Sequence, residues 1–111
     1  MTSRTKKYLS DILAAVELIE SFLLDITSFE EYQNDLKTQS AVERQLSIVG
    51  EAVAALRNEQ PPVLLMHTQQ IAGFRNRLIH AYDSIDNAVV WVIVKRHLPE
   101  LKRETTEMLA S

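Results

Sequence analysis

Cysteine is absent from this chain of 111 residues, and glycine and proline are scarce, with two and three copies. Without cysteine the chain has no disulfide framework, no cysteine-ligated zinc site and no thiol nucleophile, which is compatible with a reducing compartment. No apolar run approaches the ~20 residues that span a bilayer, and the N-terminal residues do not resemble a signal peptide or an anchor. We therefore expect a cytoplasmic protein.

The residues that are present suit one compact domain over residues 1–111, because 46% are hydrophobic and 24% are charged. A domain of this size buries a smaller share of its surface than a larger one does, so self-association would favour its stability. The net charge of −3 argues against a protein that coats nucleic acid or anionic membranes without specificity. It leaves open whether a local basic site exists within the acidic average.

Apolar residues recur at spacings of three and four along most of the chain, which is the period of an amphipathic helix. The pattern predicts one long helix over residues 4–26 and a second over residues 42–56, followed by a double proline. Between these helices, Ser28 and Glu31 have the spacing of a capping box. We therefore expect a short helix over residues 29–35.

A third long helix is expected to start at the double proline of residues 61–62, because proline suits the first turn of a helix. The helix should end near residues 82–84. Its apolar stripe consists of Leu64, His67, Ile71, Phe74, Leu78 and Ala81.

A fourth helix, capped by Ser84 or Asp86, is expected to extend to Met108. Residues 88–94 are β-branched enough to suggest a strand, but a lone strand would have no partner in a helical chain. Pro99 should kink this helix or start a new turn. The predicted fold class is therefore all-α, an antiparallel bundle of four long helices plus a short helix.

The third helix carries an unusual second face, opposite its apolar stripe. Small or apolar residues lie at its middle and polar residues at its margins: Ala72 and Ile79 between Arg75 with Tyr82 and Asn76 with His80. A two-fold axis at the small residues would bring two arginines and two histidines into one cleft. On residue types alone, however, an arginine and a histidine five positions apart are more often surface groups, and Tyr82 could be an aromatic residue at the edge of the core.

The string Arg75-Asn76, three residues, His80-Ala81-Tyr82 is similar to the Arg-x(4–6)-His motif of HEPN-domain ribonucleases, in the Arg-x4-His-x-Tyr form of HepT-like toxins. Residues 43–52 resemble the second long helix of that family, which commonly reads Arg-x-Leu-x-x-Ile-Gly-Glu-Ala. Length, helix order and the last helix with its Val-Val-Trp also fit, so the resemblance spans nearly the whole chain.

This resemblance implies an HEPN-like bundle that cleaves RNA, with tRNA favoured, without metal or cofactor, at a composite site in a homodimer. Arg75 and His80 would be the catalytic residues, with Asn76 and Arg77 in support. A histidine can exchange protons near neutral pH, and an arginine stabilises phosphate charge. The expected product is a 2′,3′-cyclic phosphate.

The resemblance also implies a partner, a MntA-like nucleotidyltransferase antitoxin that attaches AMP to Tyr82. Phosphate and adenine added next to Arg75 would compete with the substrate for its charge and fill the cleft. The alternative within the family is a catalytically inactive HEPN module that only binds such a nucleotidyltransferase.

Three other features are more simply structural. His67, His80 and His97, with Asp83, lack the spacings that give a metal two ligands from one helical turn. The basic residues Lys95, Arg96, His97, Lys102 and Arg103 could help to hold RNA, although a solvated face is the simpler reading. Arg44 and Glu51 lie on one helix face, where structural pairing is a simpler role than catalysis.

Overall fold

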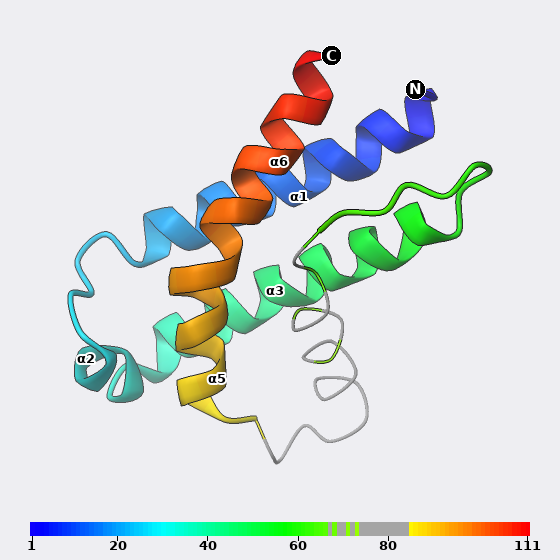
Figure 1. Cartoon of the computed structure of the whole chain (residues 1–111). Helices are drawn as coiled ribbons and strands as arrows, with labels where there is room; N and C mark the ends of the chain where they lie inside the picture. The colour runs from blue at the N-terminus through cyan, green and yellow to red at the C-terminus, as the bar shows by residue number, and fades with distance from the viewer. Residues whose placement is uncertain (67, 69–70, 72, 74–84) are drawn as a thin grey trace.

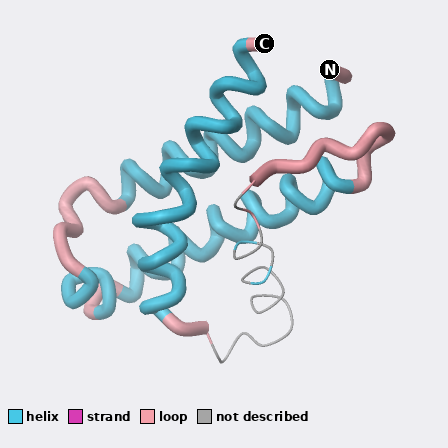
Figure 2. Tube along the Cα trace, in the orientation of Figure 1, coloured by secondary structure: helices cyan, strands magenta, loops and turns pink. Residues whose placement is uncertain are grey.

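The computed structural model describes residues 1–66, 68, 71, 73 and 85–111, and all regular structure within them is helical (Figure 1). The elements are α1 (Ser3–Phe22), α2 (Phe29–Gln33), α3 (Leu36–Arg57), α5 (Asn87–Val92), the π-helical turn η2 (Ile93–His97) and α6 (Leu98–Ala110). Figure 2 shows these helices joined by loops, without a strand in the described part of the chain. The predicted all-α class is confirmed.

The core lies between α1 and α3, which run side by side in opposite directions (Figure 1). Leu9, Ile12 and Ile19 of α1 are fully buried, as are Leu46 and Leu56 of α3. Burial of a side chain of this size contributes about 1.5–3 kcal/mol. The C-terminal helix α6 packs across α1. The contact of α1 with α3 and the contact of α1 with α6 therefore hold these three helices together.

Helix α1 ends at Phe22, four residues earlier than the apolar pattern predicts. The Leu23 amide donates to the carbonyls of Ile19 and Glu20, and the Ile26 amide then donates to the carbonyl of Leu23. Ile26 thus packs against the core from a turn. Ile26 therefore fits the apolar period because it is partly buried, although it does not lie in a helix.

Helix α2 begins as the capping box predicts, because the Ser28 hydroxyl accepts from the Glu31 amide at 3.2 Å. The Glu31 carboxylate reaches back to the amide of Thr27, at 2.9 Å. Asp35 is not part of α2. It caps α3 instead, with its carboxylate accepting from the Thr38 amide at 3.0 Å.

Helix α3 therefore starts at Leu36, six residues before the apolar pattern becomes apparent. Leu36 is exposed and the buried residue of the first turns is Gln39, which is polar. A pattern of apolar residues cannot report a turn whose buried position is an amide. The sequence prediction missed this start for that reason.

The prediction that the double proline starts a helix is wrong. Residues 61–66 are not helical, and Leu64, assigned to the apolar stripe, is 71% exposed. No residue with a good capping side chain precedes the prolines, and a residue before proline favours extended backbone. The chain instead folds back along α3, where the Val63 amide donates to the carbonyl of Leu56 at 2.8 Å (Figure 1).

Ile71 and Gly73 are helical, and Ile71 is buried in the core. The remainder of the predicted third helix lies outside the described residues. None of the helices among the described residues is both long and apolar enough to cross a membrane.

The last part of the chain is helical, as predicted, and Asp86 is its cap. The Asp86 carboxylate accepts from the Ala88 amide at 2.8 Å. Before Pro99 the helix widens into the π turn η2, in which the Leu98 amide donates to the carbonyl of Ile93. Proline cannot donate and its ring crowds the preceding turn, so a wider turn accommodates it. The predicted new turn at Pro99 is confirmed as the start of α6.

A polar contact joins α2 to α3, and an aromatic contact joins α2 to Trp91 near the end of α5. The Gln39 side-chain amide donates to the carbonyls of Tyr32 and Gln33, at 2.9 and 3.0 Å. The Tyr32 ring lies 5.5 Å from that of Trp91, and Phe29 approaches Trp91 edge-on. Burial, with the nearby charge of Glu43, raises the pKa of the Tyr32 hydroxyl above its ordinary value.

We predict that Tyr32→Phe makes the protein more resistant to alkali. In the unfolded chain Tyr32 ionises above pH ~10, whereas in the folded chain it stays protonated, so wild-type stability is present below that pH and lost above it. Phenylalanine ionises in neither state, so the variant should gain up to about 1.4 kcal/mol over wild type per pH unit above 10. Urea unfolding of both proteins at several pH values measures this difference.

At neutral pH the variant should be no less stable than wild type, because the Tyr32 hydroxyl is buried without a hydrogen-bond partner in the described structure. A constant difference between the two proteins from pH 7 to pH 11 would contradict the argument.

Candidate functional site

The predicted site residues all lie outside the residues that the structure describes: Arg75, Asn76, Arg77, His80 and Tyr82. The same is true of Ala72 and Ile79, on which the predicted dimer face rests. We call residues 75–82 the motif segment. The structure describes how the chain enters and leaves this segment, and which charged groups lie on the surrounding helices.

The chain enters the motif segment through a buried threonine that is bonded to the end of α3. Thr68 is 2% exposed, and its hydroxyl accepts a hydrogen bond from the Arg57 guanidinium at 3.0 Å. The same hydroxyl donates to the carbonyl of Leu65 at 3.2 Å. Three residues further on, Ile71 is buried in the core. The backbone that precedes the motif segment is therefore attached to α3 by polar and apolar contacts.

A second attachment comes from α6. Both carboxylate oxygens of Glu104 accept from the Met66 amide, at 3.0 and 3.1 Å. The Met66 side chain is 66% exposed, so it is the backbone of this residue that α6 holds. A hydrogen bond to an ionised carboxylate is stronger than one between neutral groups. Glu104 thus ties the non-helical connection to a helix that lies 38 residues further along the chain.

The chain leaves the motif segment through Asp86 and Asn87. Asp86 caps α5, and the Asn87 side-chain amide donates to the side-chain oxygen of Gln39 on α3 at 3.3 Å. Gln39 is the same buried residue that binds the end of α2. Described residues on both sides of the motif segment, Thr68 and Asn87, are therefore attached to α3.

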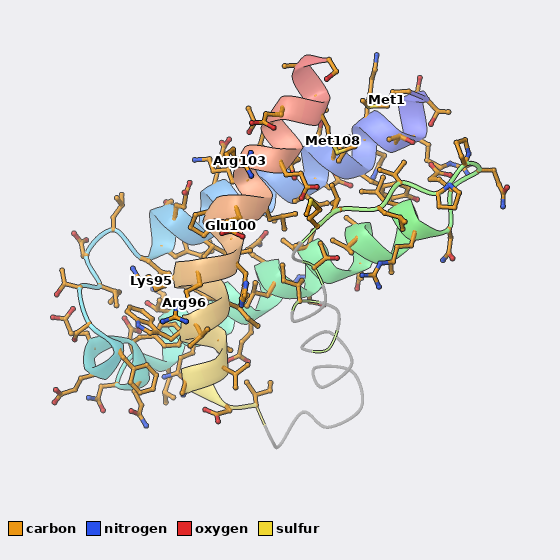
Figure 3. All side chains as sticks on the ribbon, in the orientation of Figure 1. Met1, Lys95, Arg96, Glu100, Arg103 and Met108 are labelled. Carbon is orange, nitrogen blue, oxygen red and sulfur yellow. The ribbon has the colours of Figure 1, made fainter. Side chains whose placement is uncertain are left out.

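The basic residues of the C-terminal helical region fall into two groups. Lys102 forms an ion pair with Glu20 at 2.8 Å, and Arg103 forms one with Glu107 at 3.1 Å. Lys95 instead lies over the Trp91 ring, 4.7 Å from its centroid, and Arg96 is exposed beside it. Figure 3 shows Lys95 and Arg96 near α2, and Arg103 further along α6.

Helix α3 carries the acidic and basic residues of the segment that resembles the family's second helix. Arg44 and Glu51 are both exposed, and no ion pair joins them in the described structure, so the pairing expected from their spacing is not found. Glu43 is half-buried, and desolvation raises the pKa of its carboxyl.

No group of three histidine, aspartate or glutamate side chains could share a metal ion among the described residues. His67 and His80 lie outside those residues, so the expectation that the chain holds no metal stays a prediction. Two hollows are lined by described residues. One of about 350 Å³ lies between Met1 and Glu59, and one of about 520 Å³ lies between Leu23 and Lys95.

Arg57, Thr68 and Glu104 were not singled out from the sequence. Their contacts join residues that are 11 and 38 positions apart, and no local spacing encodes such pairs.

The chain matches the family model described as "Ribonuclease HepT-like" over residues 12–108. A protein of Thermococcus cleftensis named "Probable ribonuclease HepT" is 43% identical over 101 residues, which are 87% of this chain and 88% of that protein. A protein of Methanocaldococcus jannaschii named as an RNase is 33% identical over 94% of this chain and 90% of its own length. Another, from Caldanaerobacter subterraneus, is 32% identical over 94% and 93%. No solved structure matches the chain.

We predict that Glu104→Ala loosens the connection that precedes the motif segment. Loss of a charge-assisted hydrogen bond costs about 1.5–3 kcal/mol locally, so the Met66 amide should exchange with solvent at least about tenfold faster. Hydrogen exchange followed by NMR measures this rate. Glu107→Ala is the matched control, because it removes a carboxylate of α6 that pairs only with Arg103 on the surface. Equal protection of Met66 in both variants would contradict the assigned contact.

Proposed function

The chain belongs to the HepT-like ribonuclease family, and from this membership we propose that it is a metal-independent endoribonuclease of the cytoplasm, the toxin of a toxin–antitoxin pair. The observation that supports the proposal most strongly is the family match over residues 12–108, which includes the complete string from Arg75 to Tyr82. Membership of this family supports ribonuclease activity. The reaction route, the substrate and the regulation are our inference.

The residue types of the motif segment suit cleavage of RNA by its own 2′-hydroxyl. A base must remove the proton from the 2′-oxygen as it attacks the adjacent phosphorus, and an acid must protonate the departing 5′-oxygen. His80 is a candidate for either role because an imidazole exchanges protons near neutral pH. Arg75 supplies a permanent cation with a forked set of donors for the phosphate oxygens. Asn76 would orient the imidazole or a phosphate, and Arg77 would contact the flanking backbone.

One motif segment supplies one histidine, whereas the reaction uses an acid and a base. We therefore propose a homodimer in which two copies of Arg75 and His80 share a composite site. A small self-associating domain also gains buried surface that it lacks alone. The substrate class is RNA, with tRNA favoured by the family resemblance.

The proposed regulator is a MntA-like nucleotidyltransferase that transfers AMP to the Tyr82 hydroxyl. The new phosphate would lie within reach of Arg75 and compete with the substrate phosphate for its charge. Modification would therefore lower substrate binding without unfolding the protein.

We predict that wild-type protein cuts RNA in the presence of EDTA and that His80→Ala loses this activity by a factor of about 10² to 10⁴, the usual contribution of a general acid or base. His97→Ala is the matched control, because it removes an imidazole in η2, outside the sequence of residues 75–82. Gel analysis of labelled tRNA after incubation with each protein measures the rates. The same preparations should sediment as a species heavier than the 12.7 kDa monomer.

Equal RNA cleavage by wild type and His80→Ala would contradict the enzymatic assignment, and equal growth of cells expressing either protein would contradict the toxin. An inactive wild-type chain that still binds the nucleotidyltransferase would favour the non-catalytic module. A monomer that cleaves RNA at the full rate would contradict the composite site.

We also predict that the chain isolated with its nucleotidyltransferase carries added AMP on Tyr82 and that Tyr82→Phe does not. Intact-protein mass spectrometry before and after peptide mapping measures the modification. Since phenylalanine has no hydroxyl, the variant should remain an active ribonuclease in the presence of the partner. AMP on another residue, or none, would contradict this mode of regulation.

A further inference from the structure

We propose that Lys95 and Arg96 of the turn η2 form a phosphate-binding site for the RNA strand. This inference rests on the proposed ribonuclease function and assigns to it a substrate contact outside the motif segment. In the sequence these two residues belong to a cluster of five basic residues, and the structure distinguishes them from Lys102 and Arg103.

Among the described residues, these two cations differ from Lys102 and Arg103 because they form no ion pair. Lys102 and Arg103 have carboxylate partners at 2.8 and 3.1 Å, so their charge is largely compensated locally. Within the described residues, neither Lys95 nor Arg96 has a carboxylate partner. Glu20, the carboxylate that borders the same hollow as Lys95, is already bonded to Lys102. The positive charge at η2 is therefore available to an external anion.

Lys95 is also held in place before any ligand binds. Its ammonium lies 4.7 Å from the centroid of the Trp91 ring. That ring is itself fixed by Tyr32 at 5.5 Å and Phe29 at 6.2 Å between ring centroids. A cation that rests on a fixed aromatic ring loses less rotamer freedom on binding than a free lysine does. Trp91 thus acts as a support for the cation.

The surface next to Lys95 is hollowed and partly apolar. It therefore suits a nucleic acid strand better than a flat, fully solvated surface would. An open hollow of about 520 Å³ adjoins Lys95 and is lined mainly by apolar groups, among them Leu23, Ile26 and Val94. A phosphate can contact the cations while the attached nucleoside lies against the apolar floor. Arg96 follows Lys95 directly and is exposed, so the two side chains can contact neighbouring phosphates.

The test compares RNA binding by two double variants made in the His80→Ala background, which leaves the RNA uncut. The first is Lys95→Gln with Arg96→Gln, and the second is Lys102→Gln with Arg103→Gln, which changes the charge equally on the same helical region. The probe is a fluorescently labelled single-stranded RNA, and anisotropy is measured across a series of KCl concentrations.

Loss of two phosphate contacts should reduce the slope of log K against log salt by about 1.4 for a single strand, and Kd at low salt should rise about tenfold. The Lys102/Arg103 variant should keep a slope close to that of the parent. A charge-preserving variant, Lys95→Arg with Arg96→Lys, should restore both the slope and the affinity.

An unchanged slope in the Lys95/Arg96 variant overturns this inference alone, provided that the wild-type protein cuts RNA. Absence of both RNA binding and cleavage in the wild type overturns the proposed function and this inference together. Normal RNA binding combined with lost binding to the nucleotidyltransferase would make η2 a protein interface and also overturn the proposal. An equal loss in both double variants would show a general charge effect and likewise overturn it.

Discussion

The packing of α1 against α3 is the constraint on which the other described elements depend. Both helices bury aliphatic residues over most of their length, from Leu9 to Ile19 and from Val42 to Leu56, and this pair encloses most of the described core. The other elements are attached to it. Helix α6 packs on α1, whereas α2 and α5 are joined to α3 through Gln39, and the non-helical connection is joined to α3 through Arg57.

Polar attachments of this kind hold the described residues on either side of the motif segment. Polar contacts flank the motif segment on both sides: Thr68 and Met66 before it, Asn87 after it. Side-chain bonds from Arg57, Glu104 and Gln39 make these contacts, and each comes from a regular helix. A reaction that depends on placing an imidazole and a guanidinium near one phosphate benefits from such a frame, because small displacements of catalytic groups are costly.

Much of the fold could be predicted from the sequence, and each error has a physical reason. Apolar periodicity located α1, α3 and the C-terminal helix, since burial of one face is what forms them. It placed the end of α1 too late at Ile26, which is packed from a turn, and the start of α3 too late, since the buried Gln39 is polar. The double proline was predicted to start a helix, but residues 61–66 are not helical. Residue spacing indicated an unusual second face around Arg75 and His80, and the family resemblance implied catalysis there. The contacts of Glu104 and Arg57 connect distant residues that no local pattern reports.

The net charge of −3 and the proposed RNA substrate are compatible because the positive charge of Lys95 and Arg96 is local and, among the described residues, has no carboxylate partner, whereas Lys102 and Arg103 are paired. In the proposed reaction, the RNA's own 2′-hydroxyl attacks the phosphorus. Mass spectrometry of the ends of RNA fragments produced by the wild-type protein in EDTA tests this claim most directly. Fragments that end in 2′,3′-cyclic phosphate, with 5′-hydroxyl on the other side of the cut, are the predicted result. Fragments that end in 3′-hydroxyl with 5′-phosphate would contradict it, because they require water as the nucleophile.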